Sequence, residues 1–238
     1  EVVVADIADE KSLADAMTGC DAVVLCTSAV PAIKPLSLMK TMATKFLPFV
    51  KTSRPAFKFP KNGTPEEVDW LGAKKQIDAA KTAGVKQFVF VSSMGGTNPD
   101  NFLNSIGRRK NGSGGDILLW KRKAERYLVE SGVPYTIIHP GGLVDEDGSK
   151  RELVVGVNDE IMKDPAFASG GTRSVARADV ARVCKAALGS ASATGVALDL
   201  VSKKAGDGTP TKDASTVFTA PGKYTYESAA TDPPSIFS

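Results

Sequence analysis

The stretch TPEEVDWLGAKKQIDAAKTAGVKQFVFVSSMGG, residues 64–96, decides the fold class. Its first half predicts a helix, because Thr64 and Glu67 form a T-x-x-E capping box and apolar residues then recur at helical spacing. Gly84 is placed to end that helix, and the apolar strand Gln87–Val91 follows almost directly. Such a short passage from a helix into a buried strand is typical of an α/β unit.

The same alternation of helical and strand patterns extends over most of the chain. The predicted strands are Val2–Ala5, Ala22–Cys26, Gln87–Val91, Tyr135–Ile138 and Val196–Leu200. The predicted helices are Lys11–Thr18, Glu66–Ala83, Ile117–Ser131 and Asp179–Leu188. Continuous apolar strands joined by helical crossovers predict a doubly wound parallel sheet with both faces covered, which is the α/β class.

Composition excludes several classes of protein. With 238 residues, 42% hydrophobic and 24% charged, the chain is long and apolar enough to fold as a globular domain. A net charge of +3 is too small to indicate a nucleic-acid-binding protein, and no apolar run approaches the ~18 residues of a transmembrane helix. Cys20, Cys26 and Cys184 form no C-x-x-C pair, which favours reduced thiols over a disulfide framework or a zinc site.

The predicted organisation is one domain over residues 1–202, with an insertion at 30–63, and a partly ordered C-terminal tail over 203–238. The insertion has no acidic residue, and within it Leu36–Val50 predicts a short amphipathic helix. Its basic residues are Lys34, Lys40, Lys45, Lys51, Arg54, Lys58 and Lys61. Two interpretations stay open: a solvated insertion that covers an edge of the domain, or a basic lip beside a phosphate-bearing ligand or a membrane surface.

Small or polar residues follow four of the predicted strands. They are Asp6 and Ile7, then Thr27, Ser28 and Ala29, then Ser92, Ser93, Met94, Gly95 and Gly96, then His139, Pro140, Gly141 and Gly142. In an open α/β sheet the ligand binds beyond the carboxyl ends of the strands. We therefore expect a flat ligand to approach the backbone closely at these four places.

Lys121 has an unusual position in the predicted helix Ile117–Ser131. It flanks the apolar stripe, and a lysine near the rim of a sheet is costly unless its ammonium finds acceptors. Ligand hydroxyls would supply such acceptors. A snorkelling lysine or a surface pair with Glu125 are the alternatives.

Three of these segments, taken together, resemble a known family. Val91–Ser93 after a strand, Lys121–Glu125 in a helix and Ser131–Leu143 resemble the atypical short-chain dehydrogenase/reductases, with the plant and algal subgroup most similar. The likeness covers roughly residues 1–218. It implies a Rossmann-like fold, NADP or NAD as cofactor, an unknown small molecule as substrate, and a location in the plastid or the cytosol.

The resemblance assigns the predicted strand ends to parts of the cofactor. Asp6 and Ile7 would meet the adenine, and Thr27, Ser28 and Ala29 would line the adenine-side ribose and the phosphates.

On the nicotinamide side, Ser92 and Ser93 would stand near the ring and Lys121 would hold its ribose. The run from Pro140 to Gly142 would pass beneath the nicotinamide, and His139 would make a cofactor-side or core contact.

Two departures from the family pattern bear on activity. The family's Y-x-x-x-K tyrosine position holds Ile117, and isoleucine cannot donate a proton to a carbonyl oxygen. The glycine-rich G-x-x-G-x-x-G turn is absent, so the fold is expected to lack the first β-α-β unit. On this reading Glu1 is internal to a longer protein, or Val2–Ala5 pairs abnormally with Ala22–Cys26.

Three functions follow as hypotheses. The first is an oxidoreductase that acts on a small carbonyl or alcohol, in which Ser93 orients the substrate oxygen and Lys121 the cofactor. The second is a non-catalytic NADP(H)-binding sensor or scaffold protein. The third is a fragment that binds no dinucleotide.

Overall fold

Four of the predicted strands pair in one parallel sheet, as the α/β pattern predicts. The computed structural model describes residues 1–45, 55–109, 114–167, 173–219, 221–226 and 233. The sheet consists of β1 (Ala22–Leu25), β4 (Gln87–Val91), β5 (Tyr135–Pro140), β9 (Val196–Ser202) and β7 (Leu153–Gly156), in the order β1-β4-β5-β9-β7. Only β7 runs antiparallel to its neighbour among these described strands. Leu25, Phe90 and Ile137 lie in register across the sheet, so the carboxyl ends of their strands meet at one edge.

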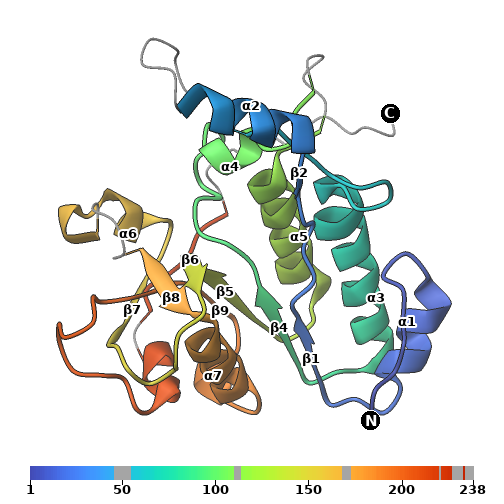
Figure 1. Cartoon of the computed structure of the whole chain (residues 1–238). Coiled ribbons are helices and arrows are strands. Elements are labelled where there is room, and N and C mark those ends of the chain that lie inside the picture. Colours follow the sequence, from blue (N-terminus) through green and yellow to red (C-terminus); the bar gives the residue numbers. More distant parts are fainter. Residues whose placement is uncertain (46–54, 110–113, 168–172, 220, 227–232, 234–238) are drawn as a thin grey trace.

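Helices cover both faces of this sheet (Figure 1). On one face lie α1 (Glu10–Met17), α3 (Ala73–Ala83) and α5 (Ile117–Ser131), and on the other lies α7 (Arg177–Ala187). The core divides accordingly, because successive residues of a strand point to opposite faces. Phe88 and Phe90 of β4 pack with the first group of helices, whereas Val89 packs with α7. The doubly wound arrangement is confirmed.

The helix before β4 begins as its sequence predicts. The Glu67 carboxylate accepts hydrogen bonds from the backbone N–H and the hydroxyl of Thr64, at 2.9 and 2.7 Å, and the Thr64 hydroxyl accepts from the Glu67 N–H at 3.3 Å. Residues Glu66–Gly72 form a π-helical segment (η1), which α3 then continues. Gly84 ends α3 in the left-handed conformation, with φ of 68°.

The strand predicted over Val2–Ala5 is wrong. This segment forms no strand, and Val2 and Val4 are 94% and 93% exposed. The alternative pairing with Ala22–Cys26 is also wrong, because β1 pairs only with β4 in the described part of the chain. A short apolar run forms no strand unless a neighbouring strand offers backbone hydrogen bonds and a face to pack on.

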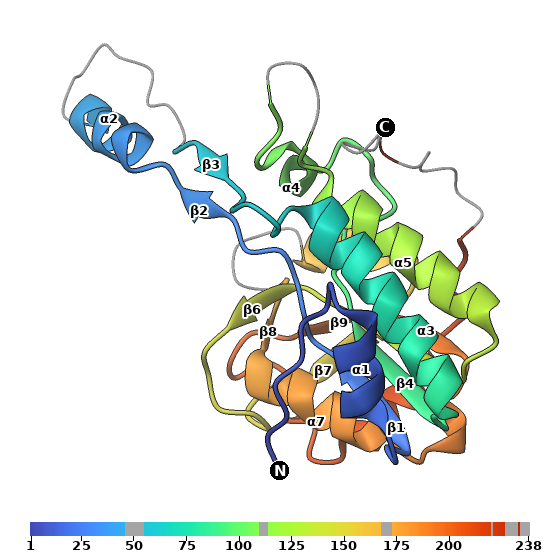
Figure 2. The same ribbon diagram turned by 90° about the vertical axis from the view of Figure 1, so that its right-hand side faces the viewer.

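The insertion at 30–63 stands away from the body of the domain (Figure 2). In it β2 (Ala32–Ile33) pairs with β3 (Phe57–Lys58), and α2 (Pro35–Lys45) lies between them in the chain. The predicted helix Leu36–Val50 is thus confirmed as far as Lys45, while residues 46–50, Lys51 and Arg54 lie outside the described residues.

Short elements complete the fold. They are α4 (Phe102–Ser105), β6 (Gly142–Val144), α6 (Glu160–Lys163), the 3-10 turns Pro165–Phe167, Ala191–Ala193 and Ala214–Phe218, and β8 (Ser174–Ala176), which pairs with β6. Val217 and Phe218 are buried against the α7 side of the sheet, although they lie beyond the predicted domain boundary at residue 202. None of the described helices is long and apolar enough to cross a membrane.

Candidate functional site

Two adjoining cavities open at the carboxyl ends of β1, β4 and β5. The larger, here called the site cavity, has a volume of about 310 Å³, and Ser28, Ser92, Ser93 and Lys121 are among the residues that line it. The smaller one, of about 230 Å³, is lined by Ser93, Pro140, Gly141 and Gly142 among others. Ser93 and Leu103 line both cavities. The structure therefore brings together seven of the twelve residues that the resemblance assigns to the cofactor.

Lys121 points into the protein and is held by an unanticipated partner. Its ammonium nitrogen lies 2.8 Å from the Asp69 carboxylate, and the two side chains are 6% and 0% exposed. The other Asp69 oxygen accepts from the backbone N–H of Ala29 at 3.2 Å, which ties Lys121 to the end of β1. The alternatives of a snorkelling lysine and a pair with Glu125 are wrong. Since an ammonium carries three donors, Lys121 keeps capacity for ligand hydroxyls.

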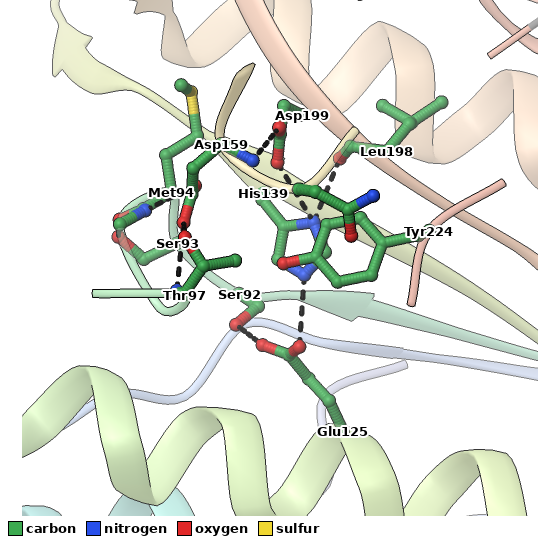
Figure 3. Close-up of polar contacts among 12 residues, drawn as sticks. Ser92, Ser93, Met94, Thr97, Glu125, His139, Asp159, Leu198, Asp199 and Tyr224 are labelled. Carbon is green, nitrogen blue, oxygen red and sulfur yellow. Dashed lines mark hydrogen bonds and ion pairs between the residues drawn. The ribbon is translucent and has the colours of Figure 1, made fainter. Parts of the chain in front are cut away.

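The two serines after β4 have different roles. Ser92 is buried, and its hydroxyl donates to the Glu125 carboxylate (Figure 3). The Ser93 hydroxyl lies 3.2 Å from the carbonyl oxygen of Met94, and Ser93 lines both cavities. Ser92 therefore fixes the turn, whereas Ser93 lines both cavities.

A buried charged network lies behind the two serines. His139 Nε2 lies 3.0 Å from the Glu125 carboxylate, and Nδ1 lies 3.2 Å from the carbonyl oxygen of Leu198 and 3.5 Å from Asp199 (Figure 3). All three partners are acceptors, so both ring nitrogens must carry a proton for His139 to satisfy them. Burial disfavours the charged ring, but the attraction of Glu125, Asp199 and Asp159 is greater and raises the pKa of His139.

Two further carboxylates link this network to the loop after Ser93. Asp159 accepts from the backbone N–H groups of Gly95 and Thr97 at 2.6 and 2.9 Å and from the Thr97 hydroxyl at 2.6 Å. The Asp159 N–H in turn donates to Asp199 at 2.8 Å. Burial raises the pKa of Asp199 to about 6, although the charge of His139 acts in the opposite direction. Asp159 and Asp199 thus hold the loop that carries Ser93 in place.

The C-terminal segment covers the network. The Tyr224 ring stacks on His139, with ring centroids 4.5 Å apart and planes 22° from parallel. Arg122 donates to the Tyr224 hydroxyl at 3.2 Å and to the Thr225 carbonyl oxygen at 3.0 Å. Arg122 is a cationic residue but is only 3% exposed, because the segment around Tyr224 lies over it.

The remaining predicted residues lie away from the two cavities. Asp6 is exposed and accepts from the Ala8 N–H, and the Ile7 side chain packs at Gly72. The Thr27 hydroxyl accepts from Gln76 at 3.2 Å. Their cofactor contacts, and that of Ala29, stay predictions.

His139 is a similar case. Its side chain is 1% exposed and contacts protein groups on each side, so its predicted cofactor contact also stays a prediction.

Sequence reasoning missed the acidic residues that organise the site. Asp199 gave a usable signal, because it interrupts the apolar strand VALDLVS, where a charge is tolerated only with partners. Glu125 gave a weaker one, since it follows Lys121 by one helical turn on the same flank of α5. No local sequence pattern marks Asp69, Asp159 or Tyr224, and only the tertiary fold reveals their roles.

The residues present fit one part of a nicotinamide dinucleotide. The Lys121 ammonium and the serine hydroxyls are suited to ribose hydroxyls and to a carboxamide. Gly141 keeps the backbone close-packed beside the smaller cavity, because a Cβ there would collide with the carbonyl oxygen of Arg173. The diphosphate part normally binds a glycine-rich turn of G-x-x-G-x-x-G spacing, which this sequence does not contain.

Two plant proteins are similar to most of this chain. An uncharacterized chloroplastic protein of Arabidopsis thaliana is 52% identical over 219 residues, which are 92% of this chain and 61% of that protein. The chain thus spans about three-fifths of that relative's length. Sanguinarine reductase of Eschscholzia californica is 43% identical over 225 residues, covering 92% of this chain and 78% of the reductase.

Solved structures agree on the fold. An oxidoreductase of Lactococcus lactis superposes with a TM-score of 0.57 at 18% identity, covering 94% of this chain and 80% of its own. A Rossmann-fold NAD(P)-binding family protein of Shigella flexneri gives a TM-score of 0.50 at 21% identity, covering 89% and 73%. The family described as NAD(P)H-binding matches residues 1–191. The chain therefore belongs to this NAD(P)H-binding family, as an atypical short-chain dehydrogenase/reductase whose cofactor is NADP or NAD.

Proposed function

We propose that this chain forms the catalytic part of an oxidoreductase that transfers a hydride between NAD(P)(H) and a small carbonyl or alcohol. The observation that supports it most is the site cavity, which Ser93 and Lys121 both line. The likeness to a protein named as a reductase, of which the chain covers 78%, favours the same reaction.

In this proposal each residue has a limited task. When bound, the nicotinamide supplies or accepts the hydride. Lys121, fixed by Asp69, would donate hydrogen bonds to the ribose hydroxyls, and Ser93 would donate to the substrate oxygen. Ile117 lines the cavity at the position where the Y-x-x-x-K pattern has its tyrosine, so the proton would come from water or from the loop between Ser92 and Asp116.

Turnover of NADPH tests the proposal. The complete protein is supplied with NADPH and a panel of aldehydes, ketones and quinones, and loss of NADPH absorbance is followed. We expect saturable turnover with at least one carbonyl, and Lys121→Ala should lower kcat/KM on the order of 100-fold because a fixed donor is lost. The exposed Lys204 is the matched control, and Lys204→Ala should retain full activity. If neither turnover nor saturable NADPH binding is found, the proposal is refuted.

The second candidate is an NADP(H) sensor or scaffold protein. Ile117 lines the site cavity and favours the sensor, since isoleucine at this position cannot donate a proton. NADPH titration by protein fluorescence separates the candidates: binding that Lys121→Ala weakens, with no turnover on the panel, identifies the sensor. The absence of any saturable binding would support the third hypothesis, that this chain binds no dinucleotide.

We also infer that the protein is located in the plastid, because the Arabidopsis relative and others are named as chloroplastic. Imaging of the complete protein fused to a fluorescent protein tests this, and exclusion of the fusion from plastids would contradict it.

A further inference from the structure

A cavity lined by cationic side chains lies next to the site cavity. It has a volume of about 210 Å³ and is formed between the β2–β3 pair and the loop that follows α4. Lys34 and Lys58 line it from the insertion, and Arg108 and Arg109 line it from the loop. The described residues that line it include no acidic side chain, and we call it the basic cavity.

Among the residues that the structure describes, most of this positive charge has no acidic counter-charge. Arg108 forms an ion pair with Asp116. Within the part of the chain that the structure describes, Lys34, Lys58 and Arg109 form no ion pair. Like charges that converge on a concave space concentrate the potential there, and such a space favours an anion.

The basic cavity and the site cavity share a wall. Phe59 lines both of them, so the two cavities lie next to one another at this side chain. Gly107 belongs to the loop that carries Arg108 and Arg109, and it lies close to the Phe59 ring. Its φ is +76°, and a Cβ at this position would lie 2.5 Å from the Phe59 Cε2 atom. Only glycine allows so close an approach, which fixes Arg108 and Arg109 relative to the site.

The space between the two ends is apolar. Phe59, Leu103 and Ile106 line the site cavity on the side away from the β-strands. They offer a surface for a ring or a short hydrocarbon body, while Ser93 and Lys121 offer donors at the other end.

We propose that the substrate carries an anionic group, a carboxylate or a phosphate, at the end remote from its reacting carbonyl, and that the basic cavity binds this group. This rests on the proposed oxidoreductase function, since it names the substrate class of that site. Phe59 and Leu103 then contact the apolar middle of the substrate, and cationic substrates are disfavoured by repulsion.

Binding of two ligands that differ mainly in charge tests the proposal without turnover. Calorimetry on the complete protein compares 2-naphthoate with 2-naphthamide at low ionic strength. We expect the naphthoate to bind about tenfold more tightly, as a charge-assisted contact allows. Lys58→Gln and Arg109→Gln should each weaken naphthoate binding several-fold and leave naphthamide binding unchanged. Lys204→Gln makes the same charge change elsewhere and should affect neither ligand.

Several results would overturn the inference. Equal affinity for the two ligands would do so, as would naphthoate binding that neither variant weakens. A loss of NADPH affinity in both variants, with naphthoate binding intact, would assign the cavity to a cofactor phosphate instead. Because none of these readouts needs a chemical reaction, the oxidoreductase proposal is judged separately, by NADPH consumption. Arg108 is left unchanged, since its pair with Asp116 stabilises the loop.

Discussion

His139 is the only histidine of the chain, and its environment favours the protonated ring. Glu125 and Asp199 outweigh the cost of burial, so we expect a pKa above the ordinary 6.5. The Hε1 proton gives a single NMR signal that can be titrated without assignment. Glu125→Gln removes the nearest charge and should lower that pKa, whereas a folded Glu125→Gln protein with an unchanged titration would contradict the network.

The same residues determine how stability varies with pH. A raised pKa of His139 means that its contribution is fully present below pH 6.5 and is lost as pH rises through the folded-state value. Asp199 acts in the same direction at lower pH, because its contribution is lost as pH rises from 3.8 to about 6. We expect the free energy of unfolding to fall above pH 6.5, with a slope of at most ~1.4 kcal/mol per pH unit. Urea unfolding from pH 6 to 9 measures it, and Glu125→Gln should flatten the slope.

Lys121 also stabilises the fold through Asp69. Replacing it by methionine leaves a fully buried carboxylate without its counter-charge, which should cost about 3 kcal/mol of unfolding free energy. Asp69→Asn in the Lys121→Met protein removes the stranded charge and should recover part of that loss. Urea unfolding of both proteins is the measurement, with Lys11→Met, at a fully exposed ion pair, as a control that should change little. Equal stability of wild type and Lys121→Met would show that the pair does not form.

At the scale of the elements, the adjacent residues Gly141 and Gly142 allow a matched test of how the backbone after β5 packs against the backbone before β8. A Cβ at Gly141 would overlap the carbonyl oxygen of Arg173 and also touch Val201, whereas a Cβ at Gly142 would lie 3.6 Å from that oxygen, an ordinary contact. Gly141→Ala must therefore displace the backbone that leads into β8, at a cost of about 1–3 kcal/mol. Gly142→Ala should change the urea midpoint little. Similar midpoints for the two variants would contradict this packing.

Elements defined by local signals could be predicted from the sequence, and those defined by distant partners could not. The capping box at Thr64 and the strand Gln87–Val91 depend on neighbouring residues, and both are confirmed. Val2–Ala5 has the composition of a strand, but a strand also needs a neighbour to pair with.

The candidate site divides in the same way. Ser93 and Lys121 could be identified from their places in a strand–turn and a helix, whereas Asp69 and Arg122 acquire their roles from segments far away in the chain. Polar residues brought together by the tertiary fold leave no periodicity that a sequence pattern can show.

At the scale of the whole molecule, segments from most of the chain hold the loop that follows β4 and carries Ser93. Ser92 contacts α5 through Glu125, Glu125 contacts β5 through His139, and Asp159 joins the loop to β9 (Figure 3). The C-terminal segment closes this assembly through Tyr224. Because the charges are buried, each depends on the others for its partners.

Tyr224 should therefore protect the network from solvent. Tyr224→Ala removes the ring that stacks on His139, and we expect it to lower the free energy of unfolding by roughly 2–4 kcal/mol. It should also open His139 to diethyl pyrocarbonate, for which the single histidine gives an unambiguous readout at one fixed pH. Tyr224→Phe keeps the ring and removes only the hydroxyl, which accepts a hydrogen bond from Arg122. His139 should therefore stay protected in this variant. If His139 is equally protected in Tyr224→Ala, another segment covers the network and the C-terminal residues are dispensable for it.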